Sequence, residues 1–434
     1  MQPSRFNIIS RLNDSLDFFV VNLLSGQADL LSEEEVAFLE RDFEKAPTEF
    51  FEKGYLADPG KEMQQYRLRY IDFIEKRDQE EVQVFFVPTY QCNFACSYCY
   101  QSEYPAPPEN LSPEMVDAFF SFMETRLRGR KKYITLFGGE PFLSGKSYKA
   151  SLAYFFEKCA ENSLEVAVVT NGYHLDQYFD LLSKVKVREI QVTLDGPEHL
   201  HDHRRPWKGG LPSFKKIVEN IDQCLSLGYI VNLRAVIDRE NMHELPALAR
   251  FAIEKGWTGL PNFKTQLGRN YELHYCQDAR NRLYSRVELY QELYRLIKDH
   301  PEILEFHKPA FSVAKFLSEN GSLPDPLFDS CPACKSEWAL DYSGRVYSCT
   351  ATVGKPGEEL GTFFPEMKLN ETAISAWQER DTLHIDKCAE CSFQLACGGG
   401  CGSVAKNQYG HLLAPDCRPV KELLEMGLDL YFGK

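Results

Sequence analysis

Residues 82–99 read VQVFFVPTYQCNFACSYC, a strand-like run that leads directly into Cys92, Cys96 and Cys99. The apolar and β-branched residues of its first half are typical of a buried strand. Three thiolates in the pattern C-x3-C-x2-C, with no fourth in reach, select zinc, copper(I) or an iron–sulfur cluster. A four-iron cluster held by three cysteines keeps one iron open to an outside ligand. The alternative is a zinc site that a distant histidine completes.

Short β-branched or aromatic runs recur after this strand, and amphipathic helical stretches separate them. The spacing predicts six strands that alternate with helices. They are expected at Val82–Thr89, Tyr133–Phe137, Glu165–Thr170, Glu189–Leu194, Val231–Ile237 and Gly259–Thr265. Such alternation predicts an α/β fold, a partial (β/α)6 barrel of the TIM type whose working face lies at the carboxyl ends of the strands. The cysteine triad follows the first strand at that end.

The first eighty residues have a pattern of their own. Three short strands are predicted at Phe6–Ile9, Phe18–Leu23 and Ala28–Leu31. A capping box at Ser32 and Glu35 opens the first of three helices, and a charged helix over Glu62–Lys76 ends the segment. This β-β-β-α-α-α order resembles the small winged-helix element that recognises peptides in enzymes that modify ribosomally made peptides. The alternative is a cap on the barrel with no ligand of its own.

From about Phe328 the alternation gives way to cysteines, glycines and turns, so this segment is expected to bury little without metal. Eight cysteines, enough for two sets of four, lie here: Cys331, Cys334, Cys349, Cys388, Cys391, Cys397, Cys401 and Cys417. Because cysteine pairs alone do not separate zinc from iron–sulfur clusters, two structural zinc sites are the alternative to two clusters.

Length and composition narrow the class of protein. A chain of 434 residues is long enough for two or three domains, one of them barrel-sized. Residues 1–6 carry no apolar signal segment and no apolar run reaches membrane-spanning length. The 14 cysteines are therefore expected in the reducing cytoplasm, as metal ligands rather than disulfides. The net charge of −14 argues against nucleic acid as a partner.

Three further strings stand where predicted strands end. FGGEP at residues 137–141 follows the second strand, TNG at residues 170–172 the third, and TLDG at residues 193–196 the fourth. Glycines let a backbone approach a ligand closely, and the carboxylate of Glu140 can accept hydrogen bonds from an ammonium group. Each string alone is typical of an ordinary turn, so the strings indicate a binding site only because all three stand at the ends of predicted strands.

Together with the triad, these strings resemble the signature of radical S-adenosylmethionine (SAM) enzymes. The resemblance implies that Cys92, Cys96 and Cys99 hold a [4Fe-4S] cluster whose open iron binds SAM. Reductive cleavage, with an electron from a flavodoxin or ferredoxin type of donor, would give a deoxyadenosyl radical that abstracts hydrogen. The resemblance also implies a SAM pocket of Tyr98, Gly138, Gly139, Glu140, Asn171, Thr193 and Arg204. In that pocket Arg204 binds the SAM carboxylate or pairs with Asp202.

The carboxyl-terminal cysteines resemble the SPASM domain, which carries two auxiliary [4Fe-4S] clusters in many radical SAM enzymes. The resemblance implies interleaved ligands, in which the early cysteines share a cluster with the last cysteine of CAECSFQLACGGGC. The first set is then Cys331, Cys334, Cys349 and Cys401, and the second set is Cys388, Cys391, Cys397 and Cys417. Full thiolate ligation leaves neither cluster an open iron, so both are expected to carry electrons or to staple the fold.

The best-known enzymes of this kind mature sulfatases or modify peptides. Sulfatase maturases carry an aspartate directly after the cysteine that is Cys349 here, and this chain has Thr350. The resemblance therefore favours an oxidoreductase that crosslinks or oxidises a precursor peptide with a leader, with a sulfatase or protein-cofactor maturase as the alternative. The rival of another class is a zinc-stabilised binding protein. No catalytic residue is assigned; Cys276 is a candidate to bind substrate or return hydrogen, against the alternative of a small buried residue.

These interpretations divide the chain into three parts. Residues 1–80 would be the winged-helix segment, residues 81–300 the partial barrel and residues 301–434 the SPASM domain. SAM and three [4Fe-4S] clusters are the expected cofactors, and neither nucleic acid nor a membrane is an expected partner.

Overall fold

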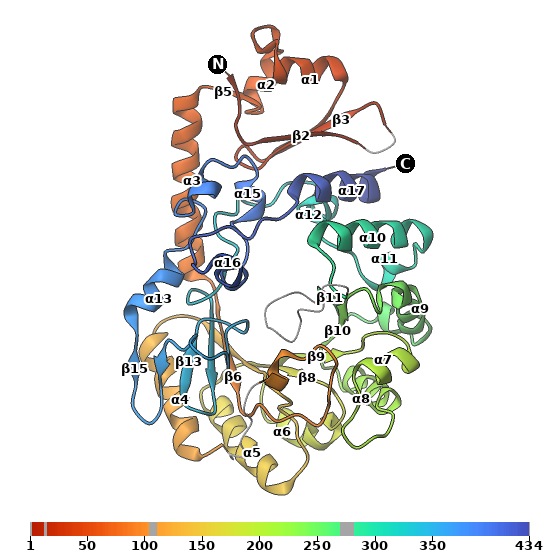
Figure 1. The fold of residues 1–434 in the computed structure, drawn as a ribbon, viewed down its shortest axis with the longest axis vertical. Coiled ribbons are helices and arrows are strands. Elements are labelled where there is room, and N and C mark those ends of the chain that lie inside the picture. The colour runs from red at the N-terminus through yellow and green to blue at the C-terminus, as the bar shows by residue number, and fades with distance from the viewer. Residues whose placement is uncertain (1, 13–14, 104–110, 270–281, 434) are drawn as a thin grey trace.

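The computed structural model describes residues 2–12, 15–103, 111–269 and 282–433. A small sheet lies at the top of Figure 1, the barrel at the bottom, and the carboxyl-terminal segment mostly between them on the left. One ten-stranded sheet runs through the lower part in the order β11-β10-β9-β8-β7-β6-β12-β13-β14-β15. None of the described helices is long and apolar enough to cross a membrane.

Six parallel strands make up the barrel part of this sheet. They are β6 (Val82–Val87), β7 (Lys132–Leu136), β8 (Val166–Thr170), β9 (Val187–Thr193), β10 (Val231–Ile237) and β11 (Phe263–Arg269). The six predicted strands are therefore present. The last one begins at Phe263 rather than Gly259, because Trp257–Gly259 forms a short 3-10 turn before it.

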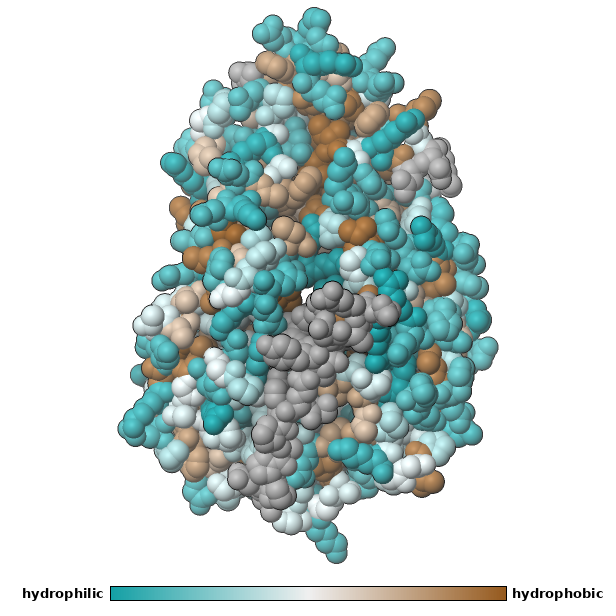
Figure 2. Space-filling model, in the orientation of Figure 1, coloured by the Kyte–Doolittle hydropathy of each residue, from teal (hydrophilic) through white to brown (hydrophobic). Residues whose placement is uncertain are grey.

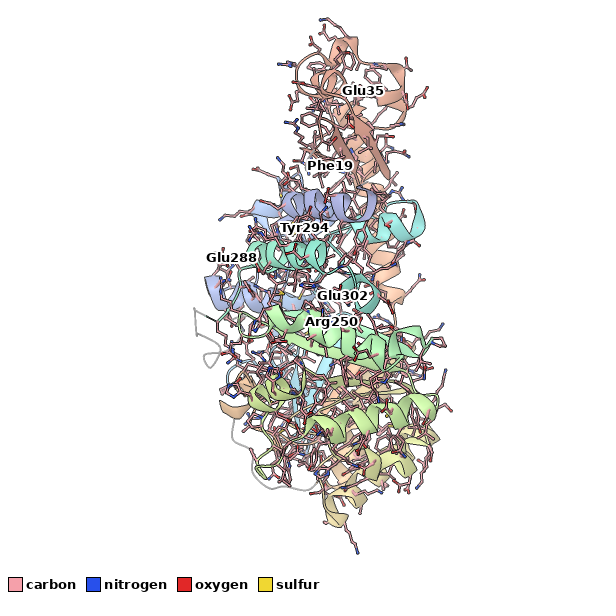
Figure 3. The ribbon with its side chains drawn as sticks, turned by 90° about the vertical axis from the view of Figure 1, so that its right-hand side faces the viewer. Phe19, Glu35, Arg250, Glu288, Tyr294 and Glu302 are labelled. Carbon is pink, nitrogen blue, oxygen red and sulfur yellow. The ribbon has the colours of Figure 1, made fainter. Side chains whose placement is uncertain are left out.

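Helices follow the strands and cover the outside of the barrel. They are α4 (Pro113–Arg126), α5 (Lys146–Glu161), α6 (Phe179–Leu182), α7 (Glu198–Arg204), α8 (Phe214–Ser226), α9 (Leu245–Glu254), α10 (Arg286–Asp299), α11 (Ile303–Phe306) and α12 (Ala314–Asn320). Ser112 caps α4 by accepting the Met115 N–H, with proline at the first helical position. Figure 3 shows Arg250 of α9 beside Glu302 at the start of α11, where the two side chains form a 2.7 Å ion pair.

The carboxyl-terminal segment is built partly on the barrel sheet. β12 (Glu337–Asp341) pairs in parallel with β6, and β13 (Arg345–Tyr347), β14 (Gly361–Thr362) and β15 (Lys368–Leu369) continue the sheet antiparallel. Trp338, Leu340 and Val346 are buried in consequence. The expectation that this segment buries little was wrong, because its apolar side chains pack against a barrel edge that no local pattern reveals. Its helices are α13 (Glu371–Gln378), α14 (Asp386–Ala389), α15 (Gln394–Cys397), α16 (Gly402–Tyr409) and α17 (Val420–Phe432).

The amino-terminal segment has the predicted β-β-β-α-α-α order. Strands β2 (Asn7–Arg11), β3 (Phe18–Asn22) and β4 (Gln27–Leu31) form an antiparallel sheet, and α1 (Glu33–Glu40), α2 (Thr48–Glu52) and α3 (Pro59–Gln79) follow. A two-stranded pair of β1 (Gln2–Pro3) with β5 (Leu56–Ala57) closes it. The capping box of Ser32 and Glu35 is present at α1.

This segment shares the main hydrophobic core with the rest of the chain. One face of its sheet packs Val20 and Leu31 against α1 and α2. The other face places Phe19 toward α17 and α10, as Figure 3 shows. Tyr66 of α3 packs on Phe328 and donates a 2.6 Å hydrogen bond to Gln394. Residues 1–80 are therefore tied to the cysteine-rich segment by buried contacts.

Candidate functional site

A cavity of about 730 Å³ runs through the inside of the barrel, from Gln83 and Lys264 near the amino ends of the strands to the residues at their carboxyl ends. Its wall contains the whole cysteine triad and five of the seven residues expected to form the SAM pocket. These wall residues are Cys92, Cys96, Cys99, Tyr98, Gly138, Gly139, Asn171 and Thr193. The residues that the radical SAM resemblance places around one ligand thus come together from the ends of four strands. Glu140 and Arg204 are the two that do not line the wall.

The triad thiols are close enough to influence one another. Burial, together with neighbouring Glu140, Cys96 and Cys99, raises the pKa of Cys92 to about 12. Burial also raises the pKa of Cys96 to about 11, against the opposing charge of Arg205. Within the described chain, no three His, Cys, Asp or Glu side chains converge closely enough to hold one metal ion. Three soft donors around a cavity fit a cluster, whose binding would displace the thiol protons.

The two glycines of FGGEP bring β7 against the loop that carries Cys92. A Cβ on Gly139 would lie 2.2 Å from the Gln91 carbonyl oxygen and 2.5 Å from that of Tyr90. The Glu140 N–H donates to the Gln91 carbonyl at 2.8 Å. The sequence predicted that these glycines let the backbone approach a ligand, and that stays a prediction. The structure shows that Gly139 also approaches the backbone of the loop that carries Cys92. Only a residue without a side chain fits there.

Glu140 joins two of the three strings behind the cavity wall. Its buried carboxylate accepts the Thr170 hydroxyl at 2.6 Å, the Asn171 N–H at 2.7 Å and the Phe142 N–H at 2.8 Å. Burial nevertheless raises its pKa to about 7. Because a carboxylate has about four acceptor positions, these three donors leave about one position for an ammonium group. Its binding of the SAM amino group stays a prediction.

Arg205, which the sequence analysis missed, lines the cavity, as do Arg188, Arg234 and Arg269. It donates to the Tyr98 hydroxyl at 2.5 Å, and that hydroxyl donates to Asp195 at 2.5 Å. Arg204 is buried beside the same tyrosine, with its Cζ 5.2 Å from the centre of the Tyr98 ring, and it pairs with Asp238 and Glu240, each at 2.8 Å. The expectation that Arg204 pairs with Asp202 is replaced by this network.

Asp202 instead caps the start of α8. Its carboxylate accepts the Ser213 N–H and hydroxyl and the Phe214 N–H. The signal that could have located the partner of Arg204 is Asp238, a carboxylate directly after β10. Strand-end carboxylates lie on the working face of such a sheet, so Asp238 was a candidate partner.

The structure brings the eight carboxyl-terminal cysteines into two groups. Burial raises the pKa of Cys349 well above its usual value, and neighbouring Glu337, Cys331 and Cys401 raise it further. Burial likewise raises the pKa of Cys334, and neighbouring Cys331 contributes to the rise. These four cysteines are the first expected set, and we call them set one.

The other four cysteines form a second group, set two. Burial, together with neighbouring Cys397, Cys417 and Cys391, raises the pKa of Cys388 to about 12. The three glycines 398–400 all have positive φ, which glycine adopts without strain. A Cβ on Gly400 would lie 2.0 Å from the Asp416 carbonyl oxygen. This glycine linker lets the chain pass from Cys397 of set two to Cys401 of set one.

Thr350 joins set one to the cavity. Thr350 directly follows Cys349 and lines the same wall as the triad. Its N–H and hydroxyl both donate to Glu337, at 2.7 Å and 3.0 Å. Cys276, the candidate for substrate binding or hydrogen return, lies outside the described residues.

Changing Gly139 to alanine should disrupt this site more than its size suggests. The new methyl group cannot fit 2.2 Å from the Gln91 carbonyl, so the loop that carries Cys92 must move. We expect the G139A variant to lose most of the triad iron after reconstitution, while set one and set two keep theirs. A Gly259→Ala variant is the control, since a Cβ there meets nothing within 4 Å and the φ of Gly259, like that of Gly139, is not positive. Full iron in G139A would contradict this account of the glycine.

Comparison with known proteins agrees with the geometry. Residues 86–252 match the model of the radical SAM superfamily. The chain is 24% identical over 380 residues to a serine-type anaerobic sulfatase-maturating enzyme of Bacteroides thetaiotaomicron, covering 79% of this chain and 86% of that protein. It is also 24% identical over 384 residues to Fe-coproporphyrin III synthase of Methanosarcina barkeri, covering 80% and 90%.

Solved structures share the fold. Native anSMEcpe with bound AdoMet has a TM-score of 0.62 at 18% identity, covering 81% of this chain and 98% of that chain. Streptococcus suis SuiB bound to precursor peptide SuiA has a TM-score of 0.55 at 14% identity, covering 96% of this chain and 98% of that chain. The chain therefore carries a radical SAM domain over residues 86–252 and is similar in sequence to a serine-type anaerobic sulfatase-maturating enzyme.

Proposed function

We propose that this enzyme modifies a ribosomally made precursor peptide, by an oxidation or a crosslink. One observation carries the proposal: the cavity that holds the triad also contains Thr350, directly after Cys349 of set one. A substrate in that cavity would therefore lie between the triad and set one. Two of the similar solved structures, SuiB with precursor peptide SuiA and anSMEcpe with a Cp18Cys peptide, hold peptides.

The residues of the chain fit three [4Fe-4S] clusters. The triad would hold one cluster with SAM, and set one and set two would hold the others. When loaded, the triad site supplies a hydrogen-abstracting radical, and the auxiliary sites supply acceptors for the electron that the substrate loses. Arg205 places a positive charge beside Cys96 of the triad. The 14 thiols of the chain suit a reducing compartment such as the cytoplasm. A flavodoxin or ferredoxin type of protein would donate the electron.

The test is turnover of a candidate precursor. Anaerobically reconstituted enzyme is mixed with SAM, a reductant and a synthetic peptide encoded by a short reading frame beside the gene. We expect deoxyadenosine together with a peptide that has lost two hydrogen atoms. Deoxyadenosine without any change in such peptides would reject the proposal.

Sulfatase maturation is the second candidate, because the curated relative from Bacteroides thetaiotaomicron aligns over 86% of its length. Against it, Thr350 stands where sulfatase maturases carry their aspartate, and its hydroxyl donates to Glu337. A peptide with the serine or cysteine of a sulfatase motif distinguishes the two candidates, since conversion to formylglycine would favour sulfatase maturation. A colourless zinc protein after anaerobic purification would point instead to the binding-protein alternative.

We also propose that residues 1–80 bind the leader of the precursor at β4. In the described sheet β4 is an edge strand, with β3 on one side only. Figure 2 shows hydrophobic surface over this sheet at the top of the molecule, and Leu30 of β4 is 64% exposed. An extended peptide can add to such an edge through backbone hydrogen bonds, with side-chain contacts giving selectivity.

A Leu30→Asp variant should bind labelled precursor at least fivefold more weakly. The charge disfavours an apolar leader side chain beside β4, whereas the fold is little affected because Leu30 is exposed. Fluorescence anisotropy measures the affinity. Leu227→Asp is the matched control, a leucine 54% exposed after α8. Deleting residues 1–76 is a poorer test, because it removes Tyr66 from the core around Phe328. If the two variants bind labelled precursor with equal affinity, residues 1–80 are only a cap on the barrel and do not bind the leader at β4.

SAM binding should weaken as the pH falls through about 7. Burial raises the pKa of Glu140 to about 7, so its carboxylate is charged above that pH and neutral below it. A neutral carboxyl loses its attraction for the SAM amino group. We expect about tenfold weaker binding at pH 6 than at pH 8, which is the change in the ionised fraction. Glu140→Gln should bind weakly at both pH values, and a wild-type affinity independent of pH would exclude this role.

A further inference from the structure

Arg380 is a fully buried arginine at the centre of the cysteine-rich segment. Its guanidinium donates to four backbone carbonyls, those of Leu412, Gly400, Gly399 and Ala414, at 2.8 to 3.0 Å. Two of them belong to the glycine linker between Cys397 and Cys401. The cation is therefore wrapped by the backbone that joins set one to set two.

The side chain lies near a thiol of each set. A Cβ on Gly402 would be 3.1 Å from Arg380 Cδ and 3.3 Å from Cys331 Sγ of set one. A Cβ on Gly399 would be 3.7 Å from Arg380 Nη1 and 3.9 Å from Cys388 Sγ of set two. The Arg380 charge also opposes the rise in the pKa of Cys388. Arg380 therefore lies between the two groups of thiols.

No carboxylate pairs with Arg380 among the described residues. Asp329, which the charge of Arg380 influences, pairs with Lys335. Asp416 pairs with Arg286 at 2.5 Å.

Asp381 accepts hydrogen bonds from Tyr70 and His384, at 2.7 Å and 2.8 Å. The neighbouring carboxylates are thus engaged elsewhere. Burying a cation without an opposite charge is strongly unfavourable, and carbonyl dipoles offset it only in part.

We propose that Arg380 is the shared counter-cation of two auxiliary clusters and raises the reduction potential of both. The inference rests on the proposed occupancy of set one and set two by [4Fe-4S] clusters. Four thiolates outweigh the positive core of such a cluster, so each loaded site is anionic and becomes more so on reduction. A nearby buried cation stabilises the reduced form, because net charge and local electrostatics set cluster potentials.

The test compares Arg380→Gln with Arg380→Lys in a full-length chain whose triad cysteines are alanine, so that only the auxiliary clusters report. Redox titration followed by electron paramagnetic resonance gives the potentials, and iron analysis gives the occupancy. In Arg380→Gln we expect the ratio of reduced to oxidised cluster at a fixed potential to fall about tenfold, which is 59 mV for a one-electron couple. Arg380→Lys keeps the charge and should stay within threefold of the parent.

Arg126→Gln is the matched control. Arg126 also influences the pKa of Cys334, but it is partly exposed and pairs with Glu371 at 2.8 Å. Solvent and Glu371 screen its charge, so its loss should leave the potentials within twofold.

Each outcome decides the inference. Full iron in Arg380→Gln with unchanged potentials would overturn it while leaving the proposed function intact. A parent chain without auxiliary clusters would overturn both. If Arg380→Gln fails to load iron, Arg380→Lys decides: loading with parental potentials supports the role of charge. Failure of both variants would show that the guanidinium is a scaffold and overturn the proposal.

Discussion

Replacing Cys92, Cys96 and Cys99 together by alanine should abolish SAM cleavage and remove one cluster. The three thiols are the soft donors in the wall of the 730 Å³ cavity, and without them no iron is held there to bind SAM. Iron should fall from about twelve to about eight atoms per chain, because set one and set two keep two clusters of four. Chromatography of deoxyadenosine and iron analysis measure both effects.

Cys159→Ala and Cys224→Ala are the controls for this experiment. Both cysteines are buried on helices outside the three groups, so each change removes a thiol and leaves a small void. Iron and SAM cleavage should stay at wild-type levels. Deoxyadenosine from the triple variant would contradict the assignment of the radical site.

Loss of an auxiliary cysteine should separate SAM cleavage from product formation. We expect Cys349→Ala of set one and Cys391→Ala of set two to keep cleaving SAM while the yield of modified peptide per deoxyadenosine falls to background. The triad follows β6 and includes neither the Cys349 thiol nor the Cys391 thiol, so the ligands at the site of SAM cleavage are unchanged. The electron lost by the substrate, however, would have no route out.

Instability is the competing explanation, since Cys349 is buried and metal sites stabilise such segments. Thermal melting and iron analysis of both variants distinguish it. A stable variant that lacks one auxiliary cluster and makes product at the wild-type yield would mean that this cluster is structural only.

Local patterns were enough for much of the fold. The alternation of strand and helix patterns predicted β6 to β11, because the hydrophobic periodicity of each element can be recognised within a few consecutive residues. The capping box of Ser32 and Glu35 is a signal contained in four consecutive residues, and it formed as predicted. The cysteine spacing likewise placed the triad at the end of β6, where the cavity lies.

Contacts between distant segments were beyond such patterns. The pairing of β12 with β6 joins residues more than two hundred positions apart, so neither strand alone shows its partner. Gly139 is a second example. The residues around it predict a turn, but they do not show that its backbone must approach the carbonyl groups of Tyr90 and Gln91 on another loop.

The sequence by itself determined the chemistry, namely thiolates in groups of three, four and four on an alternating α/β chain. The tertiary structure decided which charged side chains serve those groups. Arg204 and Arg205 are neighbours in sequence and both lie beside Tyr98, but only Arg205 lines the cavity. Arg204 instead pairs with Asp238 and Glu240, which follow β10 and reach it only in the folded chain. Arg380 likewise gains its place only when the glycine linker folds around it.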